Sequence, residues 1–241
     1  MNEYILLSVE RLRCSINQKP LLMRKILTLS IAALFLFMVS GCEDDDNDQI
    51  LDDGLTREIH ELVPAEILET SEGLGMPVYG GGQPPSIENI FECEPLEMIG
   101  TNVPNDSPVG TVFATLRARF YNQNNDKYTI SVDYTSGGEE GTGLGGFVVG
   151  DDDYFTVFAE LDASRGDAPA ELVLMFSGKL VSDGIENLHV ANFMLDNHGN
   201  EDYWIPDGTG RVFHDADGHS GIVSSVKESK TISALPGLSG E

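Results

Sequence analysis

Apolar and polar residues alternate with a period of two in a series of short segments after residue 86. This period places successive side chains on opposite faces of an extended chain, and it is typical of β-strands with one buried face. Eight segments have this pattern, or are short apolar runs compatible with a strand: residues 87–93, 112–121, 128–134, 145–149, 155–161, 172–176, 188–194 and 211–214.

Clusters of Asn, Asp, Gly and Ser separate these segments, for example at 122–126, 150–153 and 182–184. Short connections favour pairing between strands that follow one another, and closing the sheet removes its exposed edges. The pattern therefore predicts a mainly β fold: an antiparallel up-and-down barrel of about eight strands over residues 86–223. We expect residues 224–241 to be a flexible tail.

A helical period precedes the strand segments. Leu55 and Ile59 lie at helical spacing, and Pro64 is typical of the first position of a second short helix. Residues 75–85 are rich in Gly and Pro, which disfavour both a helix and a central strand. Residues 54–85 are therefore predicted to form one or two short helices and a linker.

An apolar run of 14 residues, 26–39, follows Arg24 and Lys25 and ends at Ser40-Gly41-Cys42. A transmembrane helix needs about 20 such residues. A basic start, a short apolar run and small residues before a cleavage point predict a secretory signal peptide at residues 23–41. Residues 1–22 lie upstream of this signal, and we expect a misassigned start codon there, with a long n-region as the alternative.

Val39-Ser-Gly-Cys42 resembles the lipobox of bacterial lipoproteins. That resemblance implies that Cys42 is the lipid attachment site, carries acyl groups and becomes the first residue of the mature chain. It also implies a location in the cell envelope, anchored to the outer membrane. Several acyl chains on one residue would hold the chain stably on a membrane.

Acidic residues begin directly after Cys42 and define a segment at residues 42–53. One interpretation is an extended, solvated tether. The other comes from the resemblance, because some outer-membrane lipoproteins carry acidic residues there as an address for the cell surface. Removing residues 1–41 takes away five basic and two acidic residues, so the remainder has a formal charge of −29. This charge argues against nucleic acid as a partner and favours a monomer.

The predicted barrel resembles the lipocalin-like barrels of the calycin superfamily in the number and order of its strands. The nearest match to the lipocalin Gly-x-Trp signature is Asn89-Ile90-Phe91. The stretches FYNQNN, YTSGGEEGTG and IPDGTGRVFHDADG also resemble a group of lipoproteins from Gram-negative bacteria, a likeness that supplies no activity.

Few residues suggest chemistry. His214-Asp215-Ala-Asp217-Gly218-His219 contains part of a calcium-loop pattern, but residues 213 and 224 are not carboxylates, so we expect a turn there. Asp151–Asp153 and Glu139-Glu140 are expected to be solvated turn residues. Cys93 is expected to be a small buried apolar group. We predict no catalytic residue, no cofactor and no metal ligand.

Two functions are consistent with this pattern. The first is a non-catalytic binding module for a small apolar molecule or a glycan, with Phe113, Tyr121, Tyr154 and Trp204 as aromatic contacts. The second is a structural or interaction lipoprotein without a ligand pocket, whose helices cap the barrel or bind an envelope protein. A hydrolase is the third and weakest hypothesis.

Overall fold

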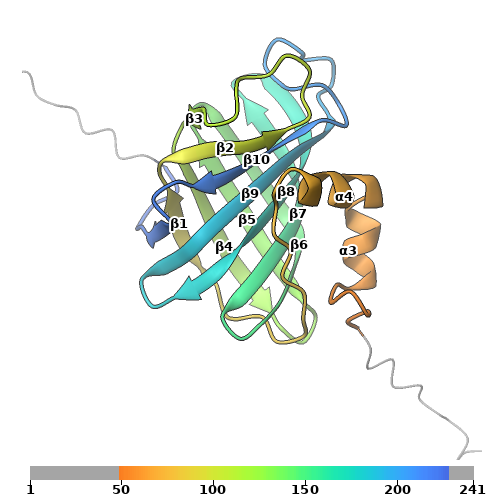
Figure 1. Ribbon diagram of the computed structural model, residues 1–241, viewed down its shortest axis with the longest axis vertical. Helices are drawn as coiled ribbons and strands as arrows, with labels where there is room; N and C mark the ends of the chain where they lie inside the picture. Colours follow the sequence, from red (N-terminus) through yellow and green to blue (C-terminus); the bar gives the residue numbers. More distant parts are fainter. Residues whose placement is uncertain (1–48, 228–241) are drawn as a thin grey trace, which may run out of the picture. The chain divides into compact units, whose positions relative to one another are not determined.

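The computed structural model describes residues 49–227, which form eleven antiparallel strands and two short α-helices (Figure 1). The prediction of a mainly β, antiparallel fold preceded by two short helices is confirmed. The elements are α3 (Arg57–Leu62), α4 (Ala65–Gly73), β1 (Asn89–Cys93), β2 (Leu96–Thr101), β3 (Val112–Phe113), β4 (Leu116–Asn124), β5 (Thr129–Ser136), β6 (Glu139–Asp151), β7 (Tyr154–Arg165), β8 (Ala168–Val181), β9 (Gly184–Asp196), β10 (Gly210–Asp215) and β11 (His219–Ile222).

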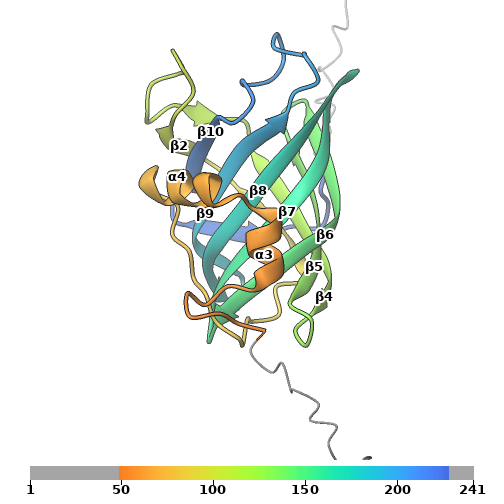
Figure 2. The same cartoon turned by 90° about the vertical axis from the view of Figure 1, so that its right-hand side faces the viewer.

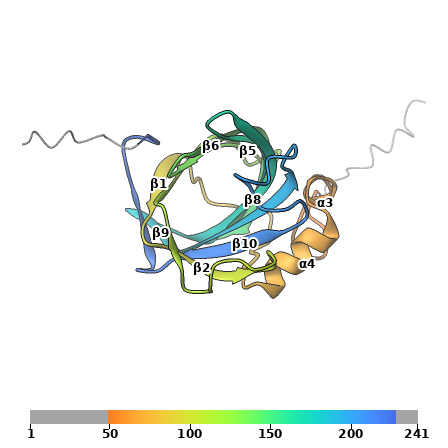
Figure 3. The ribbon, with the colours of Figure 1, turned by 90° about the horizontal axis from the view of Figure 1, so that it is seen from above.

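Eight of these strands close into a ring in the order β1-β4-β5-β6-β7-β8-β9-β11, because β11 pairs with both β9 and β1 (Figure 3). The ring is uneven. The short strand β11 pairs with residues 184–186 of β9, whereas residues 189–193 of β9 pair with β10. Strands β10, β2 and β3 therefore continue the sheet from β9 as a branch that is not part of the closed order of eight, although their side chains contribute to the same core. The expected up-and-down barrel of about eight strands is corrected in this respect, because the sheet has eleven strands and its ring closes through β11 and not through strands that follow one another.

Strand β2 was not expected because Ile99 interrupts its alternation of apolar and polar residues. Leu96 and Met98 point into the ring and Glu97 and Thr101 are polar outward residues, but Ile99 between them packs beside the helices on the outside. Strand β6 was expected only at 145–149 because glycines interrupt its pattern from residue 141 onward. The expected single segment at 112–121 is divided into β3 and β4, and β11 was not predicted.

The interior of the ring is filled by its own side chains. Phe91, Phe120, Phe155 and Phe176 are each at most 1% exposed and belong to one buried cluster. The Phe120 and Phe176 rings meet edge to face, with centroids 5.2 Å apart. Most of the barrel lumen is therefore a hydrophobic core and not a ligand cavity.

A second core lies on the outer face of β7–β10, beneath α3 and α4 (Figure 2). Ile59 and Ile67 from the helices pack in the same buried cluster as Phe158, Met175 and Phe193 from the sheet. The Thr56 side chain caps α3 by accepting a hydrogen bond from the backbone N–H of Ile59 at 3.2 Å. The helices therefore cover the side of the ring, and their apolar faces are occupied.

The Gly/Pro-rich segment after α4 is held against the sheet. The backbone N–H of Tyr79 donates to Thr156 Oγ1 at 2.8 Å, and Gly82 forms a bridge with Gly150.

No helix in the described part of the chain is long and apolar enough to cross a membrane. The predicted signal peptide, Cys42 and most of the acidic segment lie outside the described residues, as does most of the expected flexible tail.

Candidate functional site

Four connections gather at one end of the ring, which we call the mouth: residues 102–115, 136–139, 165–168 and 197–209 (Figure 1). Hydrogen bonds join them across long stretches of sequence. Arg165 Nη1 donates to the Tyr203 carbonyl at 3.3 Å, and the backbone N–H of Gly210 donates to Asn102 Oδ1 at 2.6 Å. These hydrogen bonds therefore fix the connections of the mouth relative to one another.

Two adjoining cavities lie at the mouth, and together they form the mouth site. The inner cavity has a volume of 150 Å³ and reaches Leu174 and Tyr134. The outer cavity has a volume of 330 Å³ and reaches Tyr203 and Trp204. Five residues line both cavities: Phe113, Glu139, Arg165, Asn192 and Arg211.

Glu139 is the acidic group shared by the two cavities. Strand β6 pairs with β5 so that Gly141 lies opposite Tyr134 and Glu139 lies opposite Ser136. Because Tyr134 and Ser136 are on the inward face of β5, Glu139 also points inward. The Glu139 side chain is 21% exposed, and its Oε1 lies 3.3 Å from Arg165 Nη2. Burial raises the pKa of Glu139, and the positive charges of Arg165 and Arg211 only partly oppose that rise. Glu139 is therefore not the solvated turn residue that was expected.

Arg211 is held by Asp106 at the edge of the mouth site. Its Nε and Nη2 donate to the two Asp106 carboxylate oxygens at 2.8 and 2.6 Å, and its guanidinium lies over the Phe113 ring, 5.3 Å from the centroid. Asp106 also accepts from Thr101 Oγ1 at 2.6 Å. The hydrogen bonds from Arg211 lower the pKa of Asp106 to about 2. The donors of Arg211 that face this carboxylate are thus occupied.

Two polar groups in the inner cavity have no partner among the described residues: the Tyr134 hydroxyl and Asn192 Oδ1. Tyr134 is 2% exposed, and its ring occupies space above Gly141 that a Cβ atom would fill. An unpartnered buried polar group costs about 1–3 kcal/mol. Such groups are expected where a ligand completes the hydrogen bonds.

We expect Tyr134→Phe to stabilise the unliganded protein by about 1 kcal/mol, because it removes a buried hydroxyl that has no partner. Tyr121→Phe is the matched control on the outer face, where the Tyr121 hydroxyl donates to Asp133 at 3.2 Å. That variant should lose about 0.5–1.5 kcal/mol. Denaturant unfolding measures both values, and destabilisation by Tyr134→Phe as large as that by Tyr121→Phe would contradict the assignment.

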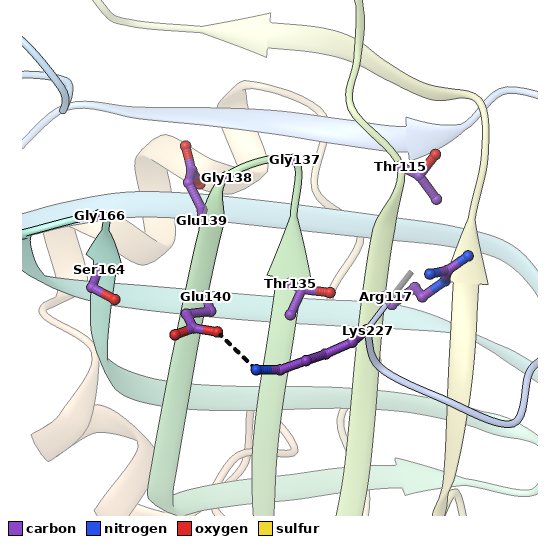
Figure 4. A pocket seen from close by; sticks show the side chains of 10 residues that line it. All are labelled: Thr115, Arg117, Thr135, Gly137, Gly138, Glu139, Glu140, Ser164, Gly166 and Lys227. Carbon is purple, nitrogen blue, oxygen red and sulfur yellow. Dashed lines mark ion pairs between the residues drawn. The ribbon is translucent and has the colours of Figure 1, made fainter. Parts of the chain in front are cut away.

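A larger hollow, of 590 Å³, lies beside the mouth and extends over the outer face of β4–β7 (Figure 4). Lys227 pairs there with Glu140 at 3.7 Å, and Thr135 Oγ1 donates to the Val226 carbonyl at 2.7 Å. Figure 4 shows Glu140 pointing towards Lys227 and Glu139 pointing away from it. The polar side chains that these contacts join are partnered within the chain, so this hollow is a weaker candidate.

The loop between His214 and His219 forms the turn from β10 to β11, as expected. The Asp217 carboxylate accepts from the backbone N–H of His219 at 2.9 Å. Asp215 is buried and accepts from Ser220 Oγ at 2.6 Å, and burial raises its pKa. Nearby Cys93 is also buried, and desolvation raises its pKa. Among residues 49–227, no group of three or more His, Cys, Asp or Glu side chains is arranged to hold a metal ion.

The predicted aromatic contacts are distributed over different surfaces. Phe113 and Trp204 both line the outer cavity, where Trp204 Nε1 donates to the Ala168 carbonyl at 3.1 Å. Tyr121 lies on the outer face below Arg119, and Tyr154 packs against Tyr79 with ring centroids 4.8 Å apart. The structure therefore brings two of the four aromatic residues together at the mouth.

Sequence reasoning missed Glu139, Arg165, Asn192 and Arg211 as site residues. A signal for Glu139 was present, since a two-residue turn at Gly137-Gly138 continues the inward alternation of Val132 and Tyr134 into the next strand. Comparison of the chain with family models, with curated proteins and with solved structures finds no match.

Proposed function

We propose that the protein is a non-catalytic binding module of the cell envelope whose mouth site holds a small polar ligand of the glycan class. The observation that carries this proposal is the pair of unpartnered buried groups, Tyr134 and Asn192, inside a cavity that opens to the surface. The ring of eight strands supports the resemblance to lipocalin-like barrels, which we include in the proposal.

The lining of the site favours a glycan over an apolar molecule. A long apolar ligand needs a lumen, and here the lumen is packed with Phe side chains. A glycan needs hydrogen-bond donors and acceptors beside an aromatic surface. Glu139, Asn192 and Tyr134 supply polar groups, and Phe113 and Tyr203 supply aromatic ones.

A ligand panel tests this proposal. The full chain, solubilised in detergent, is heated with mono- and disaccharides of glucose, galactose and N-acetylglucosamine, and with palmitate as the apolar comparison. A saccharide present at about 100 times its Kd should add about 2.7 kcal/mol of stability. A response to palmitate alone, or no response to any saccharide at saturating concentration, would reject the glycan assignment.

The lipid anchor is part of the same proposal. Val39-Ser-Gly-Cys42 at the end of an apolar run supports acylation of Cys42 and attachment to the outer membrane. The acidic residues that follow support display on the cell surface, with an extended tether as the alternative role.

We expect Cys42→Ser to move the protein completely from the membrane fraction to the soluble fraction and to abolish incorporation of labelled palmitate. A Ser40→Ala variant is the control, because it keeps both the small residue and the cysteine. A Cys42→Ser protein that still sediments with membranes and incorporates palmitate would exclude the anchor.

The alternative of an interaction lipoprotein predicted a role for the helices, either at the barrel end or against a partner. The apolar residues of α3 and α4 are instead buried against the outer face of the sheet, and the helices lie along the side of the ring. The binding module is therefore the function that the geometry supports best.

A further inference from the structure

Both arginines at the mouth site direct donors at acceptors of the chain itself, whereas two acceptor groups of the site are weakly partnered or unpartnered. Arg211 directs Nε and Nη2 at Asp106, and Arg165 directs Nη1 at the Tyr203 carbonyl. The Glu139 carboxylate has one ion-pair partner among the described residues, Arg165, at the long distance of 3.3 Å. Glu139 and Asn192 Oδ1 are therefore acceptors that a ligand at this site can use.

The charge around the site is negative. Glu139, Glu201 and Asp202 line the outer cavity with Arg165 and Arg211, and Asp106 lies directly behind Arg211. The lining thus has three carboxylates and two guanidinium groups, and one of these guanidinium groups is already paired with Asp106. The whole chain adds to this field with a formal charge of −26. A field of this sign attracts cations and repels anions such as carboxylates and phosphates.

On these grounds we propose that the ligand carries a protonated primary amine, which forms an ion pair with Glu139 at the junction of the two cavities. The inference rests on the proposed function and names the ligand class: an amino sugar, with hydroxyl groups and one ammonium group. The ammonium supplies three donors, which Glu139, Asn192 Oδ1 and the Tyr134 hydroxyl can accept. Of these three groups, Asn192 Oδ1 and the Tyr134 hydroxyl have no partner among the described residues, and Glu139 has the one ion pair with Arg165.

The test compares glucose with three sugars that each differ from it at one position: glucosamine, N-acetylglucosamine and glucuronate. Each is titrated calorimetrically into the detergent-solubilised full chain. We expect glucosamine to bind at least about tenfold more tightly than the other three, since it alone places a charged donor against Glu139. Glu139→Gln should remove this preference, because the amide keeps the shape of the side chain without its charge.

Glu140→Gln is the matched control. Glu140 is the next residue on β6, but its side chain lies on the outer face and pairs with Lys227. The preference for glucosamine should be unchanged in this variant. Loss of the preference in Glu140→Gln to the same extent as in Glu139→Gln would assign it to overall charge and overturn the inference.

The remaining outcomes separate the two proposals. Equal binding of glucosamine and glucose, or tighter binding of glucuronate, would overturn the amine inference and leave the glycan proposal standing. Binding of a neutral saccharide from the wider panel, with no binding of glucosamine, would also overturn the amine inference and leave the glycan proposal standing. If no sugar in either series binds, both proposals are rejected.

Discussion

Phe176→Ala should reduce the free energy of unfolding by about 3–5 kcal/mol, the cost of deleting a large aromatic side chain from a packed core. Phe176 is fully buried inside the ring and meets the Phe120 ring edge to face. If the interior were an open ligand cavity, Phe176 would have solvent on one side and the loss would be much smaller. Denaturant unfolding gives the value directly.

Val109→Ala is the comparison for this variant. Val109 lies in the connection between β2 and β3 and is 61% exposed, so its truncation should change stability by less than about 0.5 kcal/mol. A loss below about 1 kcal/mol for Phe176→Ala would contradict a filled interior, since core truncations of this kind cost several times that amount.

Asp106→Asn should reduce stability at pH 7 by about 2 kcal/mol. The side chain of Asp106 is 5% exposed, and its charge is matched by Arg211. Its pKa falls from the usual 3.8 to about 2 in the folded protein, so the ionised form is favoured by folding. This contribution is fully present above pH 3.8 and disappears as the pH falls towards 2. The difference between wild type and variant should therefore shrink across that interval.

Unfolding free energies at pH 7 and at several points below pH 4 check the linkage. Asp126→Asn, at an exposed turn, is the control and should stay within about 0.5 kcal/mol of wild type. A constant difference between the Asp106→Asn variant and wild type from pH 7 to pH 2 would show that the Asp106 charge is not what stabilises the mouth.

The alternation of apolar and polar residues predicted the strands with one buried face and failed elsewhere for identifiable reasons. Strand β5 alternates in sequence, because its inward side chains meet the core and most of its outward ones are polar and partly exposed. Strand β2 is less regular, because its outward residue Ile99 packs against the core beneath the helices. Strand β6 carries glycines where Tyr134 and neighbouring backbone atoms leave no space for a side chain. The alternation of apolar and polar residues therefore cannot be recognised in its sequence.

The way in which the ring closes, through β11, could not be predicted from the sequence either. It depends on β11, a strand of four residues that follows a turn and has a single large apolar residue, Ile222. Its pairing with both β1 and β9 is a long-range property of the fold. Short strands without a buried face carry little sequence signal.

The mouth site was missed because its residues come from separate elements. Arg165 on β7, Asn192 on β9 and Arg211 on β10 are isolated polar residues at strand positions, and in the sequence each is typical of an exposed side chain. Their convergence follows from strand register, which pairs Asn192 with both Leu174 and Arg211. Register is set by the whole sheet and not by any local motif.

Thermal unfolding of Asn192→Leu, with and without the saccharide that gives the largest shift in wild type, tests the mouth site most directly. Leucine has a similar size and replaces an amide whose oxygen is buried without a partner. The variant is expected to unfold at a higher temperature than wild type when no ligand is present, and to show no shift when the saccharide is added. A variant that retains the full wild-type shift would contradict the account, because the ligand would then bind outside the mouth.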